Sequence, residues 1–313
     1  MSAVGAEQVA WRDELAASVR GECRREEPLA PRTSIRVGGP ADLLVRPADL
    51  GDVVACLAAA GRLGVPVTLL GGGANVLVAD RGVRGVVLRL PADLGAERIE
   101  GARLALPAGA PIARLPARGH ELGLVGAEFL AGIPGTLGGA TVMNAGTRAG
   151  ELKDVLRRVE LCTAEGAGWV EAAALRLGYR ESHLPEGAVV TAVECELRPG
   201  DVAASRASME ADVTARRRSQ PLSQPSFGST FWNPPGRYAG QLIEQVGLKG
   251  HRVGNAMWSD VHANFLVNLG GATAADVLAL MKLARQRVRE QAGIELHAEV
   301  RLLGEFTAEE LQG

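Results

Sequence analysis

The apolar and polar positions near the start of the chain alternate between strand and helix patterns. The run ADLLVRP (41–47) predicts a strand, and DVVACLAAAGRLG (52–64) follows with helical apolar spacing and a glycine at its end. VPVTLLGGGANVLVAD (65–80) then predicts a buried strand, a glycine loop and a second strand. This alternation indicates an α+β or α/β unit in which a glycine loop lies at the end of a strand.

The pattern changes near residue 200. Before it, short β-type runs predominate, among them RLALPAG, RRVELC, WVEAAAL and AVVTAVECEL. From about Asp201 a helical pattern, DVAASRASMEADVTARRR, extends to Gln220-Pro221, where proline ends it. A domain boundary near residue 200 is therefore predicted.

A second helix is predicted late in the chain, over TAADVLALMKLARQRVREQAG (273–293). Thr273 and Asp276 have capping-box spacing, and Gly293 is placed to end the helix. Its apolar residues recur on one face, at positions 277, 280, 281, 284 and 288. This helix should pack one side against a core.

Composition excludes several classes of protein. The chain has 313 residues, enough for roughly two or three domains, and its net charge of −2 argues against nucleic-acid and membrane-surface binding. The N-terminal sequence shows no signal peptide, and no apolar run approaches the roughly 18 residues of a membrane span. The cysteines have no Cys-x-x-Cys spacing, which predicts free thiols in a reducing cytoplasm and no metal site: Cys23, Cys56, Cys162 and Cys195.

The first candidate binding segment is LLGGGANVLVAD (69–80). Successive glycines let backbone N–H groups approach an anion closely, because no Cβ stands in the way. A loop of this kind after a strand fits a pyrophosphate. The spacing is neither a Rossmann fingerprint nor a P-loop, and a turn that only connects two strands is the alternative reading. The candidate ligand-binding positions are Gly71, Gly72, Gly73, Ala74 and Asn75.

The second candidate segment is AGIPGTLGGATVMNAG (131–146). It is too rich in glycine for a stable helix interior, so we expect a loop. Two such loops cost conformational entropy unless a ligand binds them, which favours one extended dianionic ligand lying between them. The candidate residues here are Gly135, Thr136, Gly138 and Gly139.

Local sequence alone does not assign a function to three polar residues. Ser229, in FGSTFWNP, has no neighbouring histidine and no nucleophile elbow, so it reads as a turn serine. Arg180, in GYRES, reads as an exposed arginine, and Glu299, in the alternating EVRLL, as a solvent-facing strand residue. Their importance depends on the wider pattern of motifs.

From Thr33 to Gly304 the chain resembles the UDP-N-acetylenolpyruvoylglucosamine reductase family. Any one of the motifs that carry this resemblance is weak, but eight in one order are specific. They are TSIRVGGPADLLVRP, LLGGGANVLVAD, GIPGTLGGATVMNAG, GYRES, GSTFWNP, AGQLIEQVGLKG, VHANFLVN and HAEVRLLG.

The resemblance implies an α+β fold: a two-part FAD-binding region of the vanillyl-alcohol-oxidase-like (PCMH) type and a C-terminal α+β substrate-binding domain. Residues 1–35 would form an N-terminal helix and lead-in, 36–200 the FAD-binding region and 201–313 the substrate domain. The last strand would return to the active site. FAD would be held without a covalent bond by Arg36 and the two glycine segments.

The resemblance also implies the chemistry. NADPH would supply a hydride through FAD to the enolpyruvyl group of a UDP-sugar, and the negative charge that develops would need a cation and an acid. Arg180 would be the cation, protonated Glu299 a hydrogen-bond donor to the substrate carboxylate, and Ser229 the proton donor to carbon, which needs no histidine base. Substrate contacts would come from Tyr179, Asn233, Arg218 and Arg301. Arg217 would lie near the diphosphate beside Arg218, and Arg301 on the strand face of Glu299.

The resemblance carries further expectations. No metal, nucleic acid or membrane is implied, and a monomer is favoured. The short interval between Arg180 and Ser229 leaves no room for the extra loop of the longer subtype, which favours the shorter, second type. Trp232 and the pair Met257-Trp258 depart from the family pattern. A different non-covalent FAD oxidoreductase and a non-catalytic sugar-nucleotide-binding protein are the rival functions.

Overall fold

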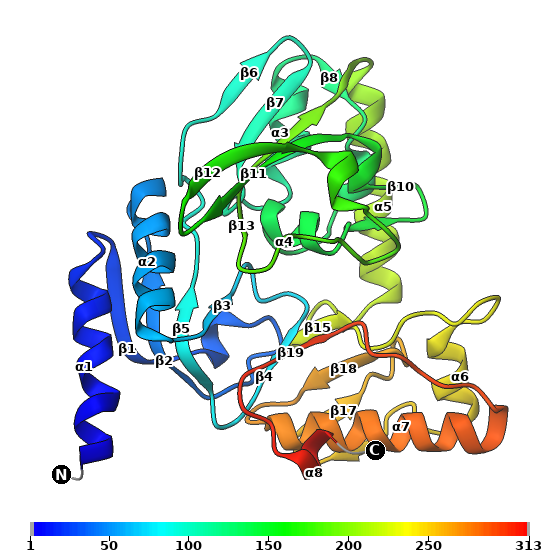
Figure 1. Ribbon diagram of the computed structural model, residues 1–313. Coiled ribbons are helices and arrows are strands. Elements are labelled where there is room, and N and C mark those ends of the chain that lie inside the picture. Colours follow the sequence, from blue (N-terminus) through cyan, green and yellow to red (C-terminus); the bar gives the residue numbers. More distant parts are fainter. Residues whose placement is uncertain (1–2, 312–313) are drawn as a thin grey trace. The chain divides into compact units, whose positions relative to one another are not determined.

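The computed structural model describes residues 3–311, with side chains described from residue 10 onward (Figure 1). The chain divides into two compact units. Unit 1 comprises the residues through Arg25 together with Leu43–Gly72 and Gly85–Thr214, and unit 2 comprises Glu26–Asp42, Gly73–Arg84 and the residues from Ala215 onward. Both units therefore contain segments that are distant in sequence.

Unit 1 contains an antiparallel five-stranded sheet with strand order β12-β11-β13-β7-β6. Helices α3 and α4 contact strand β7, and Leu104, Leu106 and Val193 are buried in the core beneath. The strands are β6 (Arg98–Glu100), β7 (Arg103–Pro107), β11 (Leu156–Thr163), β12 (Gly166–Glu171) and β13 (Val189–Glu196), and the helices are α3 (Arg114–Glu121) and α4 (Leu137–Val142). Unit 1 also contains two separate pairs of short strands. They are β8 (Leu124–Val125) with β14 (Arg198–Pro199), and β9 (Gly146–Thr147) with β10 (Gly150–Glu151).

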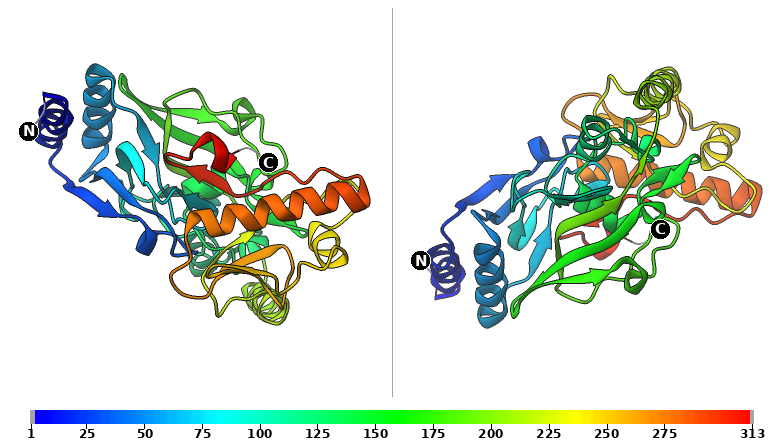
Figure 2. Two further views of the ribbon diagram at one scale, coloured as in Figure 1. Left: turned by 90° about the horizontal axis from the view of Figure 1, so that it is seen from below. Right: turned by 90° about the horizontal axis from the view of Figure 1, so that it is seen from above.

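A second, four-stranded sheet has the order β1-β2-β5-β3. Helices α1 and α2 lie side by side in both views of Figure 2, and α2 buries Val53, Cys56 and Leu57 in a core of its own. Asp49 caps the start of α2, and Gly64, at φ 65°, ends it. The elements are α1 (Ala3–Ala17), β1 (Glu22–Pro28), β2 (Pro40–Arg46), α2 (Leu50–Leu63), β3 (Val67–Leu69) and β5 (Val83–Leu88).

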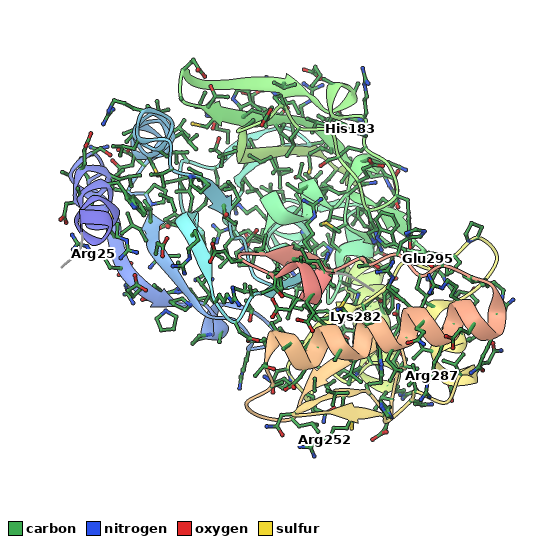
Figure 3. The ribbon with its side chains drawn as sticks, turned by 60° about the horizontal axis from the view of Figure 1, so that its bottom comes forward. Arg25, His183, Arg252, Lys282, Arg287 and Glu295 are labelled. Atoms are coloured by element: carbon green, nitrogen blue, oxygen red, sulfur yellow. The ribbon has the colours of Figure 1, made fainter. Side chains whose placement is uncertain are left out.

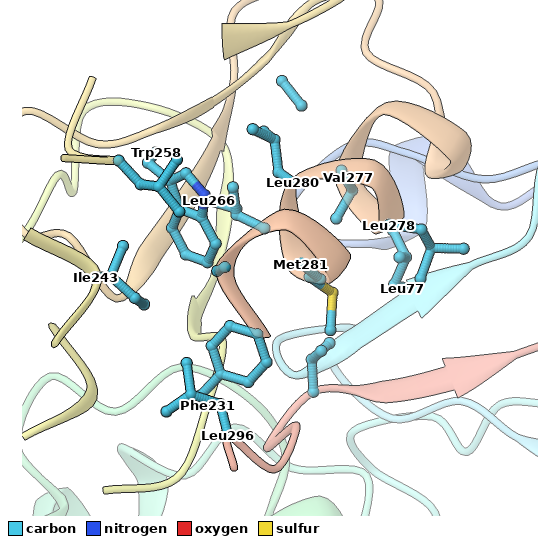
Figure 4. Packing of buried hydrophobic residues seen from close by; sticks show 14 of the residues in the cluster. Leu77, Phe231, Ile243, Trp258, Leu266, Val277, Leu278, Leu280, Met281 and Leu296 are labelled. Atoms are coloured by element: carbon cyan, nitrogen blue, oxygen red, sulfur yellow. The ribbon is translucent and has the colours of Figure 1, made fainter. Parts of the chain in front are cut away.

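Unit 2 contains an antiparallel sheet with the order β15-β18-β17-β16, and α7 packs against β16 and β17. Between them lies the core of Figure 4, where Phe231 stacks on Trp258 at 6.1 Å between ring centroids and Met281 points inward from α7. The strands are β15 (Ser226–Ser229), β16 (Arg252–Val253), β17 (Ala256–Trp258) and β18 (Phe265–Asn268), with helices α6 (Ala239–Gln245) and α7 (Ala274–Ala292).

Strand β4 (Val76–Val78) also belongs to unit 2, where it pairs in parallel with β19 (Arg301–Leu303). Lys282 and Arg287 extend from α7 (Figure 3). The Lys282 ammonium donates to the carbonyl of Glu309 in the short helix α8 (Ala308–Leu311). Helix α5 (Val202–Ser219) carries the chain from unit 1 into unit 2.

Most of the predicted elements are confirmed. The strand at 41–47 and the helices at 52–64, 201–219 and 273–293 are present, and the capping box of Thr273 and Asp276 is formed on both sides. The five periodic positions of α7 are all buried. The run WVEAAAL is a strand only as far as Glu171, after which the chain forms a 3-10 turn.

The predicted burial of strand β3 is wrong. Strand β3, expected to be buried, keeps Leu69 42% exposed, because β3 lies at the edge of its sheet. All four cysteines in the described part of the chain are free thiols. No helix of residues 3–311 is both long and apolar enough to cross a membrane.

Candidate functional site

The first glycine segment forms an open turn between β3 and β4. Gly73 has φ 66°, and a Cβ there would lie 2.1 Å from the carbonyl oxygen of Arg32, so only glycine fits. Among the described residues, the backbone N–H groups of the four positions Gly71–Ala74 form no hydrogen bond to a protein acceptor. Successive N–H groups without a protein partner are what an anion-binding turn presents, so this loop fits the diphosphate of a dinucleotide.

The second glycine segment packs directly against the first within unit 1. A Cβ on Gly72 would lie 2.7 Å from the Cα of Gly135, and a Cβ on Gly71 would lie 2.7 Å from the hydroxyl oxygen of Thr136. Gly135 itself has φ 124°, which side-chain-bearing residues rarely adopt. The two loops predicted to share a ligand are therefore in contact, and the glycines make this approach sterically possible.

The prediction of an irregular loop over 131–146 is wrong in its centre. Residues Leu137–Val142 form helix α4, and Thr136 caps it by accepting a 3.3 Å hydrogen bond from the Gly139 N–H. The N–H groups of Leu137 and Gly138 donate to the carbonyls of Ala110 and Ala108, at 2.9 and 2.8 Å. Long-range partners and a cap thus offset the low helix propensity of glycine. The N–H groups of Gly138 and Gly139 have protein partners, and a Cβ on Gly138 would lie 3.0 Å from the Cβ of Ala108, so Gly138 allows a close approach of two chain segments. The assignment of both glycines to the ligand stays a prediction.

Substituting Gly72 should separate the two loops. Because the Cβ of Gly72→Ala would meet backbone atoms, one loop must shift, and we expect FAD affinity to fall by at least about tenfold. Fluorescence titration of the apoprotein with FAD measures this loss. Gly61→Ala on the exposed face of α2, where nothing lies within 4 Å of the new methyl, is the matched control. It should bind FAD normally and gain about 0.5–1 kcal/mol of stability. Equal FAD affinity in both variants would contradict the interpretation.

Arg180 lies in unit 1 on a strained turn, with φ 58°. Its guanidinium donates through Nη2 to the carbonyl of Gly146 at 2.9 Å and stacks over the ring of Tyr179 at 5.2 Å. Tyr179 is itself 52% exposed. A non-glycine residue in this conformation costs free energy that the surrounding contacts must offset, and such strain is concentrated at functional sites. The side chain is therefore held at the edge of the second glycine segment.

Asn144 explains how this turn is held, and sequence reasoning did not single it out. It is fully buried at φ 39°, and its Nδ2 donates to the carbonyl of Gly178 at 2.8 Å and to the carboxylate of Glu151 at 3.0 Å. Its Oδ1 accepts from the N–H of Lys153. Asparagine tolerates positive φ and offers both a donor and an acceptor, which is the signal that could have identified it within VMNAG.

Ser229 ends strand β15 in unit 2, opposite Phe265 of β18 and after an irregularity in the strand register. The next residue, Thr230, is fully buried and donates its N–H to the carbonyl of Asn264 at 2.8 Å. The Asn264 side chain bonds both the N–H and the carbonyl of Phe231, at 3.0 and 2.8 Å. Asn264 thus replaces a strand neighbour and fixes the backbone that follows Ser229. It is a second residue that sequence reasoning missed.

Glu299 lies beside this serine segment. Its N–H donates to the carbonyl of Thr230 at 2.8 Å, and Ala298 bridges to Phe231. Strand β19 begins only at Arg301, so Glu299 lies outside the strand that was expected to contain it. The prediction that Glu299 and Arg301 share one face stays a prediction. The backbone bends at Val300, whose side chain is buried. The structure therefore brings Ser229 and Glu299 together on neighbouring segments, while Arg180 belongs to unit 1.

His262 adds a neutral imidazole to the same part of unit 2. Its ring packs against Phe265 at 4.9 Å, and Nδ1 accepts a 3.2 Å hydrogen bond from the N–H of Asn264. Burial lowers the pKa of His262 below its ordinary value, which favours the uncharged ring at neutral pH. With Nδ1 acting as an acceptor, this ring carries its proton on Nε2.

The other predicted residues occupy varied positions. Arg36 is exposed at φ 58°, and its carbonyl accepts a 3.3 Å hydrogen bond from the buried Asn268. Asn233 is exposed, and its Oδ1 accepts from the N–H of Ala239 at the start of α6. Arg217, Arg218 and Arg301 are also exposed. Of the two departures, Trp258 belongs to the hydrophobic core of unit 2, and the backbone N–H of Trp232 donates to the carbonyl of His297.

A mixed α+β fold with two abutting glycine loops and an open row of backbone N–H groups defines an FAD-binding protein. A family model described as "FAD binding domain" matches residues 41–169, and one described as "UDP-N-acetylenolpyruvoylglucosamine reductase, C-terminal domain" matches residues 220–303. The chain belongs to the UDP-N-acetylenolpyruvoylglucosamine reductase family.

Individual relatives support this assignment across nearly the whole chain. The chain is 67% identical to the UDP-N-acetylenolpyruvoylglucosamine reductase of Anaeromyxobacter dehalogenans strain 2CP-C, covering 97% of this chain and 92% of that protein. It is 56% identical to the reductase of Myxococcus xanthus, covering 91% and 93%. The crystal structure of the reductase from Thermus caldophilus matches with a TM-score of 0.78 at 38% identity, covering 91% of this chain and 99% of that one.

Proposed function

We propose that this protein reduces UDP-N-acetylenolpyruvoylglucosamine to UDP-N-acetylmuramate, with NADPH as the reductant, in the synthesis of peptidoglycan precursors. The observation that carries the proposal is the hydrogen bond from the Glu299 N–H to the Thr230 carbonyl, which holds an acid next to Ser229. The identity to named reductases over 97% of the chain supports the choice of substrate.

The reaction balances with one hydride and one proton. When bound, FAD would supply the hydride chemistry that connects NADPH to the terminal carbon of the enolpyruvyl double bond, and the two glycine segments would hold it. The C=C π bond breaks, its electron pair moves toward the adjacent carbon and the carboxylate, and a proton then bonds to that carbon. NADPH is oxidised and the enolpyruvyl ether becomes a lactyl ether.

Each of the three polar residues has one part in this scheme. The Arg180 guanidinium stabilises the negative charge that spreads into the substrate carboxylate. Protonated Glu299 donates a hydrogen bond to the same carboxylate, and the Ser229 hydroxyl gives its proton to carbon. Stabilisation of this kind accelerates the reaction because the charge is larger in the transition state than in the substrate.

Substrate contacts complete the proposal. Tyr179, with half of its surface exposed, and the exposed side chain of Asn233 are assigned to the substrate, together with the cations of Arg218 and Arg301. Asn233 uses Oδ1 to cap α6, which leaves its Nδ2 as the donor toward an anionic group. Residues 36–200 are assigned to FAD and 201–313 to the sugar nucleotide. The active form is a cytoplasmic monomer, and both co-substrates are water-soluble nucleotides.

A direct assay tests the function. NADPH consumption by the FAD-loaded protein should depend on the enolpyruvyl sugar nucleotide and should yield one equivalent of the lactyl product per NADPH. Rapid NADPH oxidation that uses oxygen and ignores the sugar nucleotide would favour another FAD oxidoreductase instead. Tight binding of the sugar nucleotide without any turnover would favour a non-catalytic binding protein.

We expect the flavin to be bound without a covalent bond. The segment 69–80 contains neither histidine nor cysteine, the side chains that would attach to a flavin there. The purified protein should therefore be yellow and should release free FAD on heat or acid denaturation. Absorbance of the filtrate after denaturation and ultrafiltration measures this release. Flavin retained with the denatured chain would contradict the expectation, and a preparation unable to take up FAD would contradict the cofactor.

A further inference from the structure

Both peptide groups of Glu299 are hydrogen-bonded to segments that are distant in sequence. Its N–H donates to the carbonyl of Thr230 at 2.8 Å, and its carbonyl accepts from the side-chain Nδ2 of Asn75 at 3.0 Å. Because Glu299 precedes β19, no strand ladder holds it, and these two bonds take that place. The backbone position of Glu299 therefore depends directly on the side chain of Asn75.

Asn75 is also the last of the five candidate ligand-binding positions in the first glycine segment, directly before strand β4. Its own carbonyl accepts from the N–H of Arg301 at 3.1 Å, so it brackets the bend at Val300 from both sides. The following residues, Val76–Val78, pair in parallel with Arg301–Leu303. A displacement of the glycine turn is thus transmitted to Glu299 through one side-chain bond and one backbone bond.

The far end of strand β4 is fixed as well, which makes this connection stiff. The carboxylate of Asp80 accepts from the N–H groups of Ala274 and Ala275 at 2.8 and 3.1 Å, at the start of the long helix α7. A carboxylate at a helix N-terminus is favourable because it meets unpaired N–H groups and the positive end of the helix dipole. Both ends of β4 are therefore held by hydrogen bonds, so this strand does not absorb a displacement of the turn.

The boundary between the two units falls inside this glycine turn. Gly72 belongs to unit 1 and Gly73 to unit 2, the unit that also contains Thr230 and Glu299. An anion bound by the N–H groups of Gly73 and Ala74, which belong to unit 2, would order the residues directly before Asn75. The residue that connects this ordering to Glu299 is Asn75.

We propose that Asn75 is a positioning residue that couples occupancy of the glycine turn by the diphosphate of FAD to the placement of the Glu299 carboxyl group. The proposal rests on the proposed function for its catalytic consequence, but the coupling itself is a property of the fold. Asparagine is required because the carbonyl of Glu299 needs a donor. An aspartate of the same shape would instead bring a carboxylate oxygen against a carbonyl oxygen.

The catalytic arm uses Asn75→Ala and Asn75→Asp at saturating FAD, so that weakened cofactor binding does not enter. We expect reoxidation of the flavin by the enolpyruvyl sugar nucleotide to slow by about tenfold or more, because small displacements of a reacting group are costly. KM for the sugar nucleotide and flavin reduction by NADPH should change little. Asn255→Ala in unit 2, whose side chain accepts from Arg252, is the matched control and should behave as the parent.

Combining the substitutions distinguishes positioning from general damage. In a Glu299→Gln background, Asn75→Ala should cause no further loss, because the group that it positions no longer carries a proton. Independent, multiplying losses in the double variant would overturn the proposal. So would parental reoxidation rates in Asn75→Ala at saturating FAD.

A second arm needs no sugar nucleotide and so remains decisive if the proposed function fails. Addition of FAD to the apoprotein should slow hydrogen exchange at the N–H groups of Glu299 and Arg301, read from peptides spanning 297–303. In Asn75→Ala this protection should fall to that of the apoprotein, although the variant still binds FAD. Equal protection in the two proteins would overturn the coupling. Protection lost only in the variant, from a protein that does not turn over the sugar nucleotide, would support the coupling and reject the proposed function.

Discussion

Replacing Glu299 by glutamine is expected to slow flavin reoxidation by the enolpyruvyl sugar nucleotide by about 100-fold or more, the scale of general-acid and electrostatic effects. Reduction of the flavin by NADPH should remain close to the parental rate. Glutamine keeps the length and planarity of the side chain, and it removes the titratable proton. The expected loss is therefore confined to one half-reaction.

The structure indicates that this substitution changes the carboxyl group and keeps the backbone hydrogen bonds of residue 299. Two contacts that place Glu299 are made by its backbone, through the N–H to Thr230 and the carbonyl to Asn75, and these two survive a change of side chain. Folding and FAD content should accordingly match those of the parent. The loss then reports on the carboxyl group and not on displacement of the chain.

Stopped-flow absorbance of the flavin measures the two half-reactions separately. Glu290→Gln, on the exposed face of α7, changes the same functional group away from Ser229 and is the matched control. It should reproduce the parental rates in both directions. Near-parental reoxidation in Glu299→Gln would show that Glu299 is structural. An equal fall in both half-reactions would point to a misplaced flavin.

Local signals in the sequence were sufficient for the elements that depend on local contacts. Helix α7 illustrates this, because a capping box within four residues, a regular apolar face and a terminal glycine predict its bounds, and the distant Asp80 only adds to its N-terminus. Helix α2, with Asp49 at its start and Gly64 at its end, is a second example. The boundaries of such helices follow from side chains inside the element.

The errors lie where distant partners decide the structure. Helix α4 forms in a glycine-rich stretch because the carbonyls of Ala108 and Ala110 bond its first N–H groups, and no local pattern announces this. The strand expected at Glu299 begins two residues later, because Thr230 and Asn75 hold Glu299 outside the ladder. The roles of Ser229, Arg180 and Glu299 were inferred from the order of motifs, and they stay predictions.

The asparagines that hold the backbone around the candidate site could not be identified from the sequence, for the same reason. Asn144, Asn264 and Asn268 each bond the backbone of a segment far away or around a tight turn. An asparagine in a loop is common enough that its partner, not its position, gives it meaning. Sequence alone therefore proposed residues for the chemistry, but it did not reveal the asparagines that hold the segments around them.

Replacing Ser229 by alanine should leave a protein that folds, binds FAD and is reduced by NADPH at close to the parental rate. Its flavin should then stay bleached when the enolpyruvyl sugar nucleotide is added, with reoxidation slower by about 100-fold or more. The physical reason is that the charge that develops on the carbon next to the terminal, hydride-accepting carbon finds no proton. Net hydride transfer to the terminal carbon is therefore not completed.

The surroundings of Ser229 favour this selective loss. Strand β15 is held by its pairing with β18 and, beyond Ser229, by Asn264, and none of these contacts uses the serine hydroxyl. His262 is kept neutral by burial and uses Nδ1 as an acceptor, so it is a poor substitute acid. Ser229→Cys, which keeps a proton on a larger atom, should recover part of the activity.

Stopped-flow absorbance for both half-reactions, together with a product analysis in heavy water, decides the role of Ser229. The parent should place one solvent deuterium on the carbon that bears the ether oxygen, with a single stereochemistry, because a fixed hydroxyl reaches only one face. Ser223→Ala, an exposed loop serine of the same unit, is the matched control and should keep both rates. If reoxidation in Ser229→Ala stays as fast as in the parent, water or Glu299 must supply the proton. If reduction by NADPH fails to the same degree, Ser229 positions the flavin or the fold, and the assignment of the acid is wrong.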